Sequence, residues 1–549
     1  MKLIFGILLA VFVQSSAQAE MATPKFAVIG NQAAPQGGTF QYNFGAEPPT
    51  LNPITSTDAY AALFHEYTHD FLLSRNWDTY GWDPGLAESW EVSKDGKVLT
   101  FKIRQGAKWH DGKPVTAEDV KFSFDAIFDD TYNAAPMRAY FESIEKAELL
   151  DPMTIRFTAK TKYFGNLDAL AGTLKISPKH IYGDAKKGVK LNKTDVGSGP
   201  YKLEKYEQGQ RLTIVRNKDW WGNNIPELKG KYNFERIIIR FVQADAIAFE
   251  MVKKGQLDLQ PLNAEFYLKK AVGPEWGKTV HKVKYENKKV KPYGFIGWNF
   301  KNPVFTDRDV RVALLHLMNR QLMNDKFNFG MSLLATGPWY VQSEYADPSV
   351  KPVLFDPKAA AALLTKAGWK DDDKNGVLEK TVDGKKVEFR FGLLNPSKDY
   401  EKYFTVYKED LKKAGIDMEI RTLEWNAFLK ALDDKKFDAV ALSWSGGDID
   451  LDPKQIWHTT SSSKGGSNFI SYSNPEVDKL IDQSREELDK AKRVKILRQV
   501  YTKIAADAPY AWMFVPRYGF YAHTNKIGKP KDTLGYDVGR FYWWVQKPE

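Results

Sequence analysis

Alternating and helix-periodic apolar positions recur along the chain and predict both strands and helices. Residues 39–45, TFQYNFG, alternate apolar and polar side chains, as a half-buried strand does. Thr57 or Asp58 can cap a following helix that runs to about Leu73. Its apolar face would consist of Ala62, Leu63, Phe64, Tyr67, Phe71 and Leu72. The folded region is therefore expected to open with a strand and a helix.

The stretch from residue 86 combines strand alternation with clear turn and cap signals. Two strand-like runs flank the turn at residues 94–96, KDG, and HDGKPV makes a second turn. Thr116 can cap the next helix, with Glu118 and Asp119 in its positive first turn. This order predicts a hairpin followed by a helix.

The second half of the chain has the rhythm of an α/β protein. Residues 297–321 join a strand to a helix, for which Thr306 and Asp309 form a candidate capping box. Residues 356–369 predict a further helix, and residues 413–444 alternate strand, helix and strand. The predicted fold class is therefore α/β.

The first nineteen residues are typical of an export signal. Lys2 provides the positive start, residues 3–13 form an apolar run too short to span a bilayer, and Ala17 to Ala19 fit a small-x-small cleavage site. We expect residues 1–19 to be a signal peptide and no further transmembrane segment. Its removal takes away one Lys and no acid, so the formal charge falls from +10 to +9.

Composition narrows the compartment and the class of partner. A chain of 549 residues is long enough for two to four domains with sizeable cores. It contains no cysteine, which excludes disulfides and a thiol-linked lipid anchor and favours the bacterial periplasm or exterior. Its positive charge is spread along the chain without a basic stripe, so no nucleic-acid partner is expected.

Several sequence blocks occur in the order found in one transport family. They are LAESWEVSKDGKVLTFKIRQGAKWHDGKPVTAEDV, GSGPYKL, DRDVRVAL, AAALLTKAGW and SNFISYSNPEVDKLID. With them the chain resembles the family 5 solute-binding proteins of bacterial ABC importers, the oligopeptide- and dipeptide-binding group. The resemblance runs from about residue 38 to the C-terminus and is nearest to the microcin C and oligopeptide subgroup.

The resemblance implies a two-lobed periplasmic binding protein fold, type II and cluster C-like, with an extra domain inserted in the first lobe. On this chain the first lobe would comprise residues 20–71, 196–292 and 508–549. The extra domain would comprise residues 72–195, and the second lobe residues 293–507.

The resemblance also implies a function in solute binding and transport, without catalysis. Such a protein is a periplasmic monomer that closes like a hinge on a peptide or peptide-like solute and delivers it to the permease of an ABC importer. It is not an enzyme and has no cofactor. Relatives that take up sugars, nickel complexes or opines leave a non-peptide solute open as the alternative.

One motif suggests a different function. His65, Glu66 and His69 spell H-E-x-x-H, which on a helix can bind zinc through the two histidines and use the glutamate as general base. A peptidase needs a third ligand, and no suitable one follows: Glu88 is separated by residues 82–85, WDPG. The motif is interpreted as structural, and a zinc metallopeptidase is kept as a remote alternative.

The acidic stretch at residues 371–379, DDDKNGVLE, suggests calcium. Asp371, Asp373, Asn375 and Gly376 occupy positions 1, 3, 5 and 6 of an EF-hand loop, but position 12 is Val382 rather than glutamate. A glycine-punctuated hairpin turn is the preferred interpretation, and no metal site is predicted.

Candidate ligand-binding residues follow a hydrophobic strand near residue 444. Trp444 and Ser445 can provide wall and hydrogen bonds, and the loop beyond them lies where α/β lobes bind ligands. In peptide-binding relatives an acid just after such a Trp pairs with the peptide's α-ammonium. Asp448 is the first choice for that role and Asp450 the second, while Asp452 is expected to cap the next helix.

Two further positions match the family near the cleft. Glu47 lies at the end of a first-lobe strand that meets extended ligands, although Pro48 and Pro49 remove backbone donors there. Asn468 matches a position near the cleft. Trp109 and Trp425 are assigned to the core.

Overall fold

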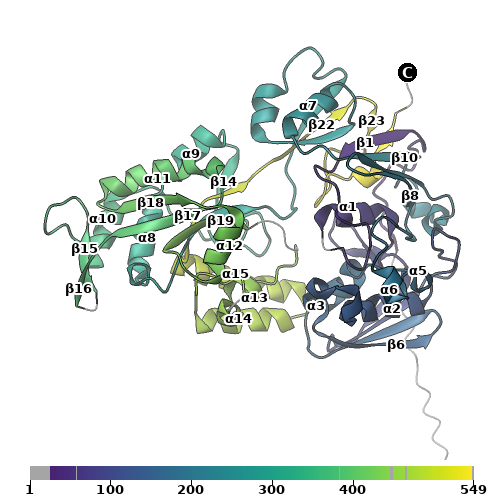
Figure 1. Ribbon diagram of the computed structural model, residues 1–549, viewed down its shortest axis with the longest axis horizontal. Helices are drawn as coiled ribbons and strands as arrows, with labels where there is room; N and C mark the ends of the chain where they lie inside the picture. Colours follow the sequence, from purple (N-terminus) through teal and green to yellow (C-terminus); the bar gives the residue numbers. More distant parts are fainter. Residues whose placement is uncertain (1–24, 57, 383, 445–448, 464–465, 547–549) are drawn as a thin grey trace, which may run out of the picture.

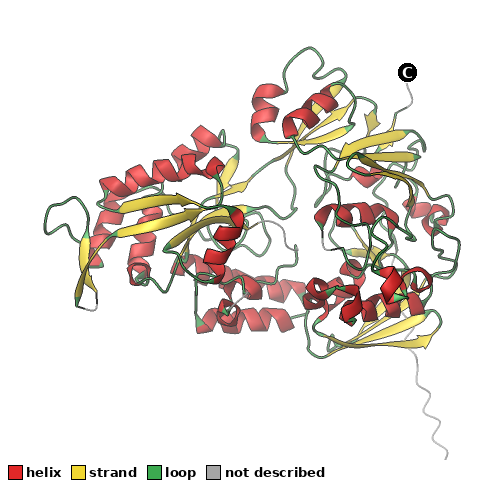
Figure 2. Ribbon diagram, viewed as in Figure 1, coloured by secondary structure: helices red, strands yellow, loops and turns green. Residues whose placement is uncertain are grey.

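The computed structural model describes residues 25–56, 58–382, 384–444, 449–463 and 466–546. Figure 1 shows two large parts side by side, one formed mainly by the middle of the chain and the other by both ends. Figure 2 shows that helices and strands are mixed in both parts. Within the described ranges, none of the helices combines the length and apolar character that crossing a membrane requires. The predicted signal peptide lies outside the described residues.

A seven-stranded sheet collects strands from distant parts of the sequence. Its order is β12-β22-β11-β1-β10-β9-β8, and β1 runs parallel to both β10 and β11. The strands are β1 Thr39–Asn43, β8 Tyr201–Glu207, β9 Arg211–Arg216, β10 Arg236–Arg240, β11 Leu259–Leu262, β12 Val280–Tyr285 and β22 Gly519–Thr524. Inward-facing Phe40, Ile237 and Tyr521 belong to its core. Early, middle and late segments thus build one lobe.

A four-stranded antiparallel sheet has its own apolar core beside that lobe. Its order is β4-β5-β7-β6, formed by β4 Ala87–Val92, β5 Val98–Ile103, β7 Thr154–Ala159 and β6 Ile144–Asp151. Helix α2, Ala117–Phe128, packs against it and begins at the predicted cap Thr116, which forms a capping box with Asp119. Trp109 is 2% exposed in this core, as predicted.

A five-stranded sheet with its helices forms the other lobe. Its order is β18-β17-β19-β13-β20, and the strands are β13 Tyr293–Trp298, β17 Arg390–Asn395, β18 Asp417–Thr422, β19 Ala439–Trp444 and β20 Tyr510–Trp512. Helix α11, Glu401–Lys413, packs against β18, and α8, Arg308–His316, against β20. The predicted α/β unit at residues 413–444 is present, with α12, Trp425–Asp433, between β18 and β19.

Two chain segments connect the five-stranded and seven-stranded sheets. One runs from β12 to β13 across residues 286–292, and the other runs from β20 through β21, Phe514–Pro516, to β22. Short paired crossovers of this kind can act as a hinge between lobes. The fold is therefore the expected two-lobed one, with strand β20 of the second lobe lying after residue 507.

Some local expectations were wrong. Helix α1 spans Ala59–Thr68 and ends before Leu73, because the amide of Gly199 binds the carbonyl of Thr68 and the chain turns extended at His69. The cap of α8 is Asp307 rather than Thr306. Trp425 is 49% exposed and stacks on Phe428 instead of filling the core.

Candidate ligand site between the lobes

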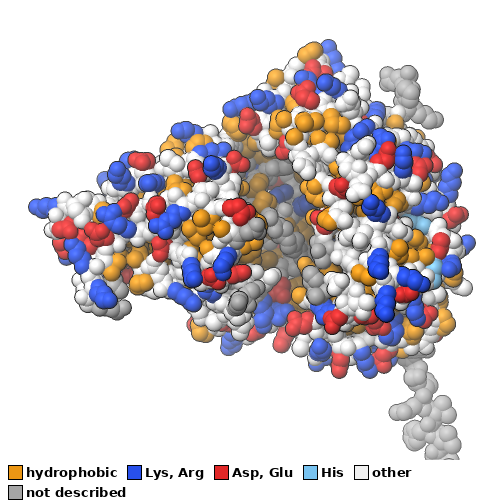
Figure 3. Space-filling view, in the orientation of Figure 1, with side chains coloured by type: hydrophobic (Ala, Val, Ile, Leu, Met, Phe, Trp, Pro, Cys, Tyr) orange, Lys and Arg blue, Asp and Glu red, His pale blue; other side chains and the backbone are white. Residues whose placement is uncertain are grey.

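A cavity of about 1130 Å³ lies between the four-stranded and five-stranded sheets. Figure 3 shows the molecule hollowed between its two parts. Residues between 139 and 173 line one side of the cavity. The other side is lined by residues within 290–293, 338–340 and 450–461, together with Trp444 and Arg485. The volume suits a short peptide or a solute of similar size.

Aromatic side chains of the second lobe form one wall of this cavity. Trp444, predicted as a wall residue, lies at the end of β19 and lines the cavity beside Trp339 and Tyr293. Its ring stacks on Phe295 at 6.1 Å between centroids, and its indole N–H donates to the hydroxyl of Tyr510 at 3.4 Å. The wall is held by packing behind it, so it offers a preformed apolar surface.

Asp450 lines the cavity, but its carboxylate already has partners. The hydroxyl of Tyr345 donates to Oδ1 at 2.5 Å, and Lys490 and Arg493 lie 3.4 and 3.7 Å from the same oxygen. Both cations come from helix α15, Lys490–Asp507. A ligand ammonium at Asp450 would have to compete with two resident positive charges.

Asp452 joins the two sides of the cavity. Its Oδ2 accepts from the hydroxyl of Tyr163 at 3.0 Å and from Nε of Arg485 at 2.9 Å, while Oδ1 accepts from the amide of Lys454 at 3.1 Å. The last bond reaches the first residue of α13, Lys454–Trp457, but the N-cap position is Pro453 and not the expected Asp452. The first two were not expected, and the bond from Tyr163 connects the region of the four-stranded sheet to the second lobe.

Lys291 is a cavity residue that the sequence did not single out. It lies in the 286–292 crossover and is 9% exposed. Its ammonium donates to Oδ1 of Asn287 at 2.9 Å, and among the described residues no carboxylate lies within ion-pair distance of it. Burial and neighbouring Lys289 lower the pKa of Lys291 to about 8. A buried ammonium without a counter-ion is costly, so the site favours an anionic group on the ligand.

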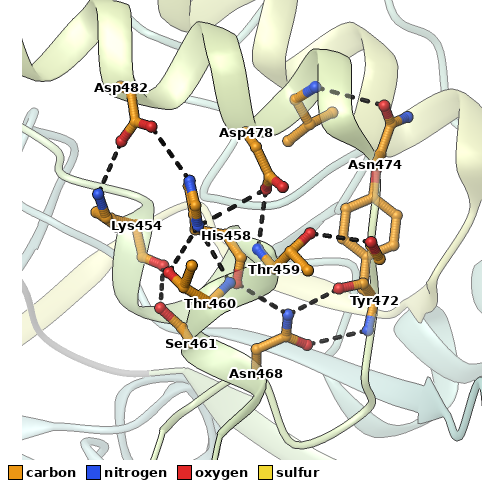
Figure 4. Close-up of polar contacts among 12 residues, drawn as sticks. Lys454, His458, Thr459, Thr460, Ser461, Asn468, Tyr472, Asn474, Asp478 and Asp482 are labelled. Atoms are coloured by element: carbon orange, nitrogen blue, oxygen red, sulfur yellow. Dashed lines mark hydrogen bonds and ion pairs between the residues drawn. The ribbon is translucent and has the colours of Figure 1, made fainter.

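Glu47 and Asn468 do not line this cavity. Oε1 of Glu47 accepts from the hydroxyl of Tyr206 at 2.5 Å. Asn468 is 1% exposed, and its amide donates to the carbonyls of His458 and Tyr472 and accepts from the amide of Tyr472 (Figure 4). Asn468 therefore fixes a loop. Ser445 and Asp448 lie outside the described residues.

The two histidines of H-E-x-x-H are buried next to Asp195. Nε2 of His69 lies 2.8 Å from Oδ1 of Asp195, and Nδ1 lies 3.1 Å from the carbonyl of Ile176. Both partners are hydrogen-bond acceptors, so both ring nitrogens of His69 face oxygen atoms of the protein. Burial opposes ionisation of Asp195, yet His69 holds the pKa of its carboxyl below the ordinary value.

The remaining ring and the glutamate of the motif are also engaged. Nε2 of His65 lies 2.9 Å from the carbonyl of Leu51, and burial lowers the pKa of His65, so this ring is neutral. Oε2 of Glu66 accepts from Nη2 of Arg540 at 2.5 Å. His65, His69 and Asp195 lie close enough to share an ion, but a metal would have to displace these hydrogen bonds, and the motif's base is held in an ion pair.

Known proteins resemble the chain along nearly all of its length. The sequence profile described as "Bacterial extracellular solute-binding proteins, family 5 Middle" matches residues 81–468. The oligopeptide-binding protein AppA of Bacillus subtilis is 28% identical over 531 residues, which cover 93% of this chain and 92% of AppA.

Solved structures give the same result for the fold. AppA from Bacillus subtilis in complex with a nonapeptide has a TM-score of 0.71 at 26% identity, covering 94% of this chain and 100% of AppA. NikZ from Campylobacter jejuni in complex with Ni(L-His) has a TM-score of 0.72 at 22% identity, covering 92% and 99%. The chain belongs to the bacterial extracellular solute-binding proteins of family 5.

Proposed function

We propose that this solute-binding protein captures peptides or peptide-like solutes between its two lobes and delivers them to the permease of an ABC importer. The observation that carries the proposal is the cavity of about 1130 Å³ between the lobes, which has an aromatic wall and includes Lys291, a buried cation without an ion pair among the described residues. The oligopeptide-binding relatives support a peptide as the ligand.

Charge complementarity assigns roles within the cavity. Lys291 would bind a carboxylate of the solute, since its ammonium has only a neutral amide oxygen as partner within the described part of the chain. Asp450 is poorly suited to bind the α-ammonium, because Lys490 and Arg493 already neutralise it. We therefore retain Asp448 as the proposed partner of that ammonium, and Trp444 and Ser445 as contacts of the peptide.

The proposal includes a domain division, a location and an assembly state. Residues 1–19 would be a signal peptide, residues 72–195 an extra domain, and the mature protein a periplasmic monomer without a lipid anchor. The separate core of the four-stranded sheet supports the extra domain. The protein would make and break no bond in its ligand, because Glu66, the glutamate of the H-E-x-x-H motif, is paired with Arg540.

Mass spectrometry of solutes released from the purified protein tests the ligand class. Peptides, recovered intact and able to raise the melting temperature when added back, are the expected result. A sugar, metal complex or opine recovered instead would replace the peptide by the alternative solute. Cleaved peptides would contradict the non-enzymatic role.

A further inference from the structure

The acidic turn at residues 371–379 lies far from the cavity and is not used by the proposed function. It connects helix α10, Pro357–Lys366, to a hairpin of β15, Glu379–Val382, and β16, Lys385–Glu388. Figure 1 places this hairpin at the end of the second lobe that points away from the other lobe. Any ligand of this turn would therefore bind independently of the transported solute.

The structure supplies a carboxylate that the loop pattern lacked. Position 12 of the pattern is Val382, but Glu379 at position 9 turns toward the first two acids. Carboxylate oxygens of Asp371, Asp373 and Glu379 all lie within 4.8 Å of one another. Gly376 has φ +87°, as the sharp turn at position 6 requires.

The orphaned oxygen of Glu379 is an independent indication that a ligand is missing. Glu379 is only 5% exposed, and its Oε1 accepts from the amides of Asp372 at 3.0 Å and Asp373 at 3.2 Å. Its Oε2 is buried and has no hydrogen-bond partner among the described residues. A buried carboxylate oxygen without a hydrogen-bond partner destabilises the fold, and a bound cation would satisfy it.

Two charged neighbours also affect Glu379, although the first of them, Glu388, is itself paired with Arg390 at 2.7 Å. Glu388 lies directly opposite Glu379 in the hairpin ladder, a pairing of like charges that destabilises a sheet. Lys386 partly offsets this charge, with Nζ 2.6 Å from Oδ2 of Asp373 and 3.3 Å from Oε1 of Glu379. Its side chain is half exposed and flexible, so a divalent ion can displace it into solvent.

We propose that Asp371, Asp373 and Glu379 bind one calcium ion, in exchange for the ammonium of Lys386. The donors are all oxygens from an irregular loop, which suits Ca²⁺ better than Zn²⁺ or the strictly octahedral Mg²⁺. Water would complete the coordination at the exposed side. Three carboxylates with a competing lysine predict a dissociation constant of about 10⁻⁴ to 10⁻³ M, the range of extracellular calcium modules.

Calorimetric titration of CaCl₂ into the full-length, chelator-treated protein tests the proposal. We expect one site per chain, a melting temperature raised by about 1–2 °C in 5 mM CaCl₂, and binding at least about tenfold weaker for MgCl₂. E379Q and D371N should each weaken calcium binding about tenfold or more. K386M should tighten it several-fold, because it removes the competing charge.

D372N is the matched control, since it makes the same charge change at an exposed position between two proposed ligands. It should change the calcium affinity by less than about threefold. The proposal is wrong if neither the wild type nor K386M binds calcium up to 10 mM. It is equally wrong if D372N weakens binding as much as D371N, because the turn would then attract cations only through its net charge.

Discussion

The hydroxyl of Tyr163 donates a hydrogen bond to the carboxylate of Asp452 at 3.0 Å across the cavity. Arg485 strengthens this contact, with Nε 2.9 Å from the same oxygen and its guanidinium 4.7 Å from the ring of Tyr163. The amide of Phe164 also donates to the carbonyl of Arg485 at 3.0 Å. These bonds fasten the region of the four-stranded sheet to the second lobe on one side of the ligand site.

Substituting Tyr163 by Phe should weaken the contact between the region of the four-stranded sheet and the second lobe. Y163F removes the hydrogen bond to a charged acceptor, a loss on the order of 1–2 kcal/mol in the closed form. We expect peptide affinity to fall about five- to thirtyfold, measured by calorimetry with a peptide that binds the wild type. Y140F changes an exposed tyrosine that lines the same cavity and should leave affinity unchanged. Equal affinities for Y163F and the wild type would exclude a role for the contact in holding the ligand.

Substituting Lys291 by Met should remove a preference for anionic ligands. The wild type should bind a peptide with a free C-terminal carboxylate at least about tenfold more tightly than the same peptide with a C-terminal amide. K291M should bind both forms alike, with little change for the amide. The preference should also decline as the pH rises from 7 to 9, because Lys291, with a pKa of about 8, then loses its proton.

The control for Lys291 is its exposed neighbour Lys289, whose side chain is 60% exposed. K289M removes the same charge from the same crossover and should keep the preference. A C-terminally amidated peptide with an acidic side chain tests whether Lys291 binds the C-terminal carboxylate specifically or any carboxylate of the peptide. If K291M weakens free-acid and amidated peptides equally, Lys291 is structural, although peptide capture itself would still stand.

Substituting Glu66 by Gln should cost stability and change no activity. Arg540 is 9% exposed and would lose its main counter-charge, a loss of about 1–2 kcal/mol after allowing for partial exposure of Glu66. The melting temperature should fall by about 1–2 °C. Neither protein should cleave casein or peptides with added Zn²⁺. Zinc-dependent cleavage by the wild type that disappears in E66Q would instead establish a peptidase.

Buried histidines should make the protein sensitive to acid. Burial lowers the pKa of His110 from 6.5 to about 4, while Nδ1 accepts from the amide of Gly197 and Nε2 donates to the carbonyl of Gly199. Between pH 6.5 and 4 the unfolded chain takes up a proton that the folded chain does not, so stability falls with pH, by on the order of 1–3 kcal/mol. H110Q retains a donor and an acceptor without titrating. Between pH 7.5 and 4.5 the melting temperature of H110Q should fall less than that of the wild type. Equal decreases in the two proteins would contradict a contribution of His110 to acid sensitivity.

The sequence predicted what local patterns determine. Alternation and caps predicted β1, β19 and helix α2, and Trp444, at the end of β19, lines the cavity. Helix α1 was predicted too long, because its end depends on Gly199, which lies 131 positions after Thr68. Trp425 was wrongly assigned to the core, since apolar character alone does not show which helix face is covered.

Charge pairing over long sequence separations was beyond sequence reasoning. Glu66 and Arg540 are 474 positions apart, so the chemistry of H-E-x-x-H could not be judged from the motif alone. Asp450 is neutralised by a helix that begins forty positions later, at Lys490. Lys291 lies in a run of three similar lysines, KKVK, and only its burial distinguishes it.

Small-angle X-ray scattering during a peptide titration tests closure of the two lobes over the solute most directly. With a peptide that raises the melting temperature, the radius of gyration should fall as binding saturates, and the peptide released afterwards should have its original mass. A radius that stays constant at full occupancy would contradict closure of the two lobes over the solute.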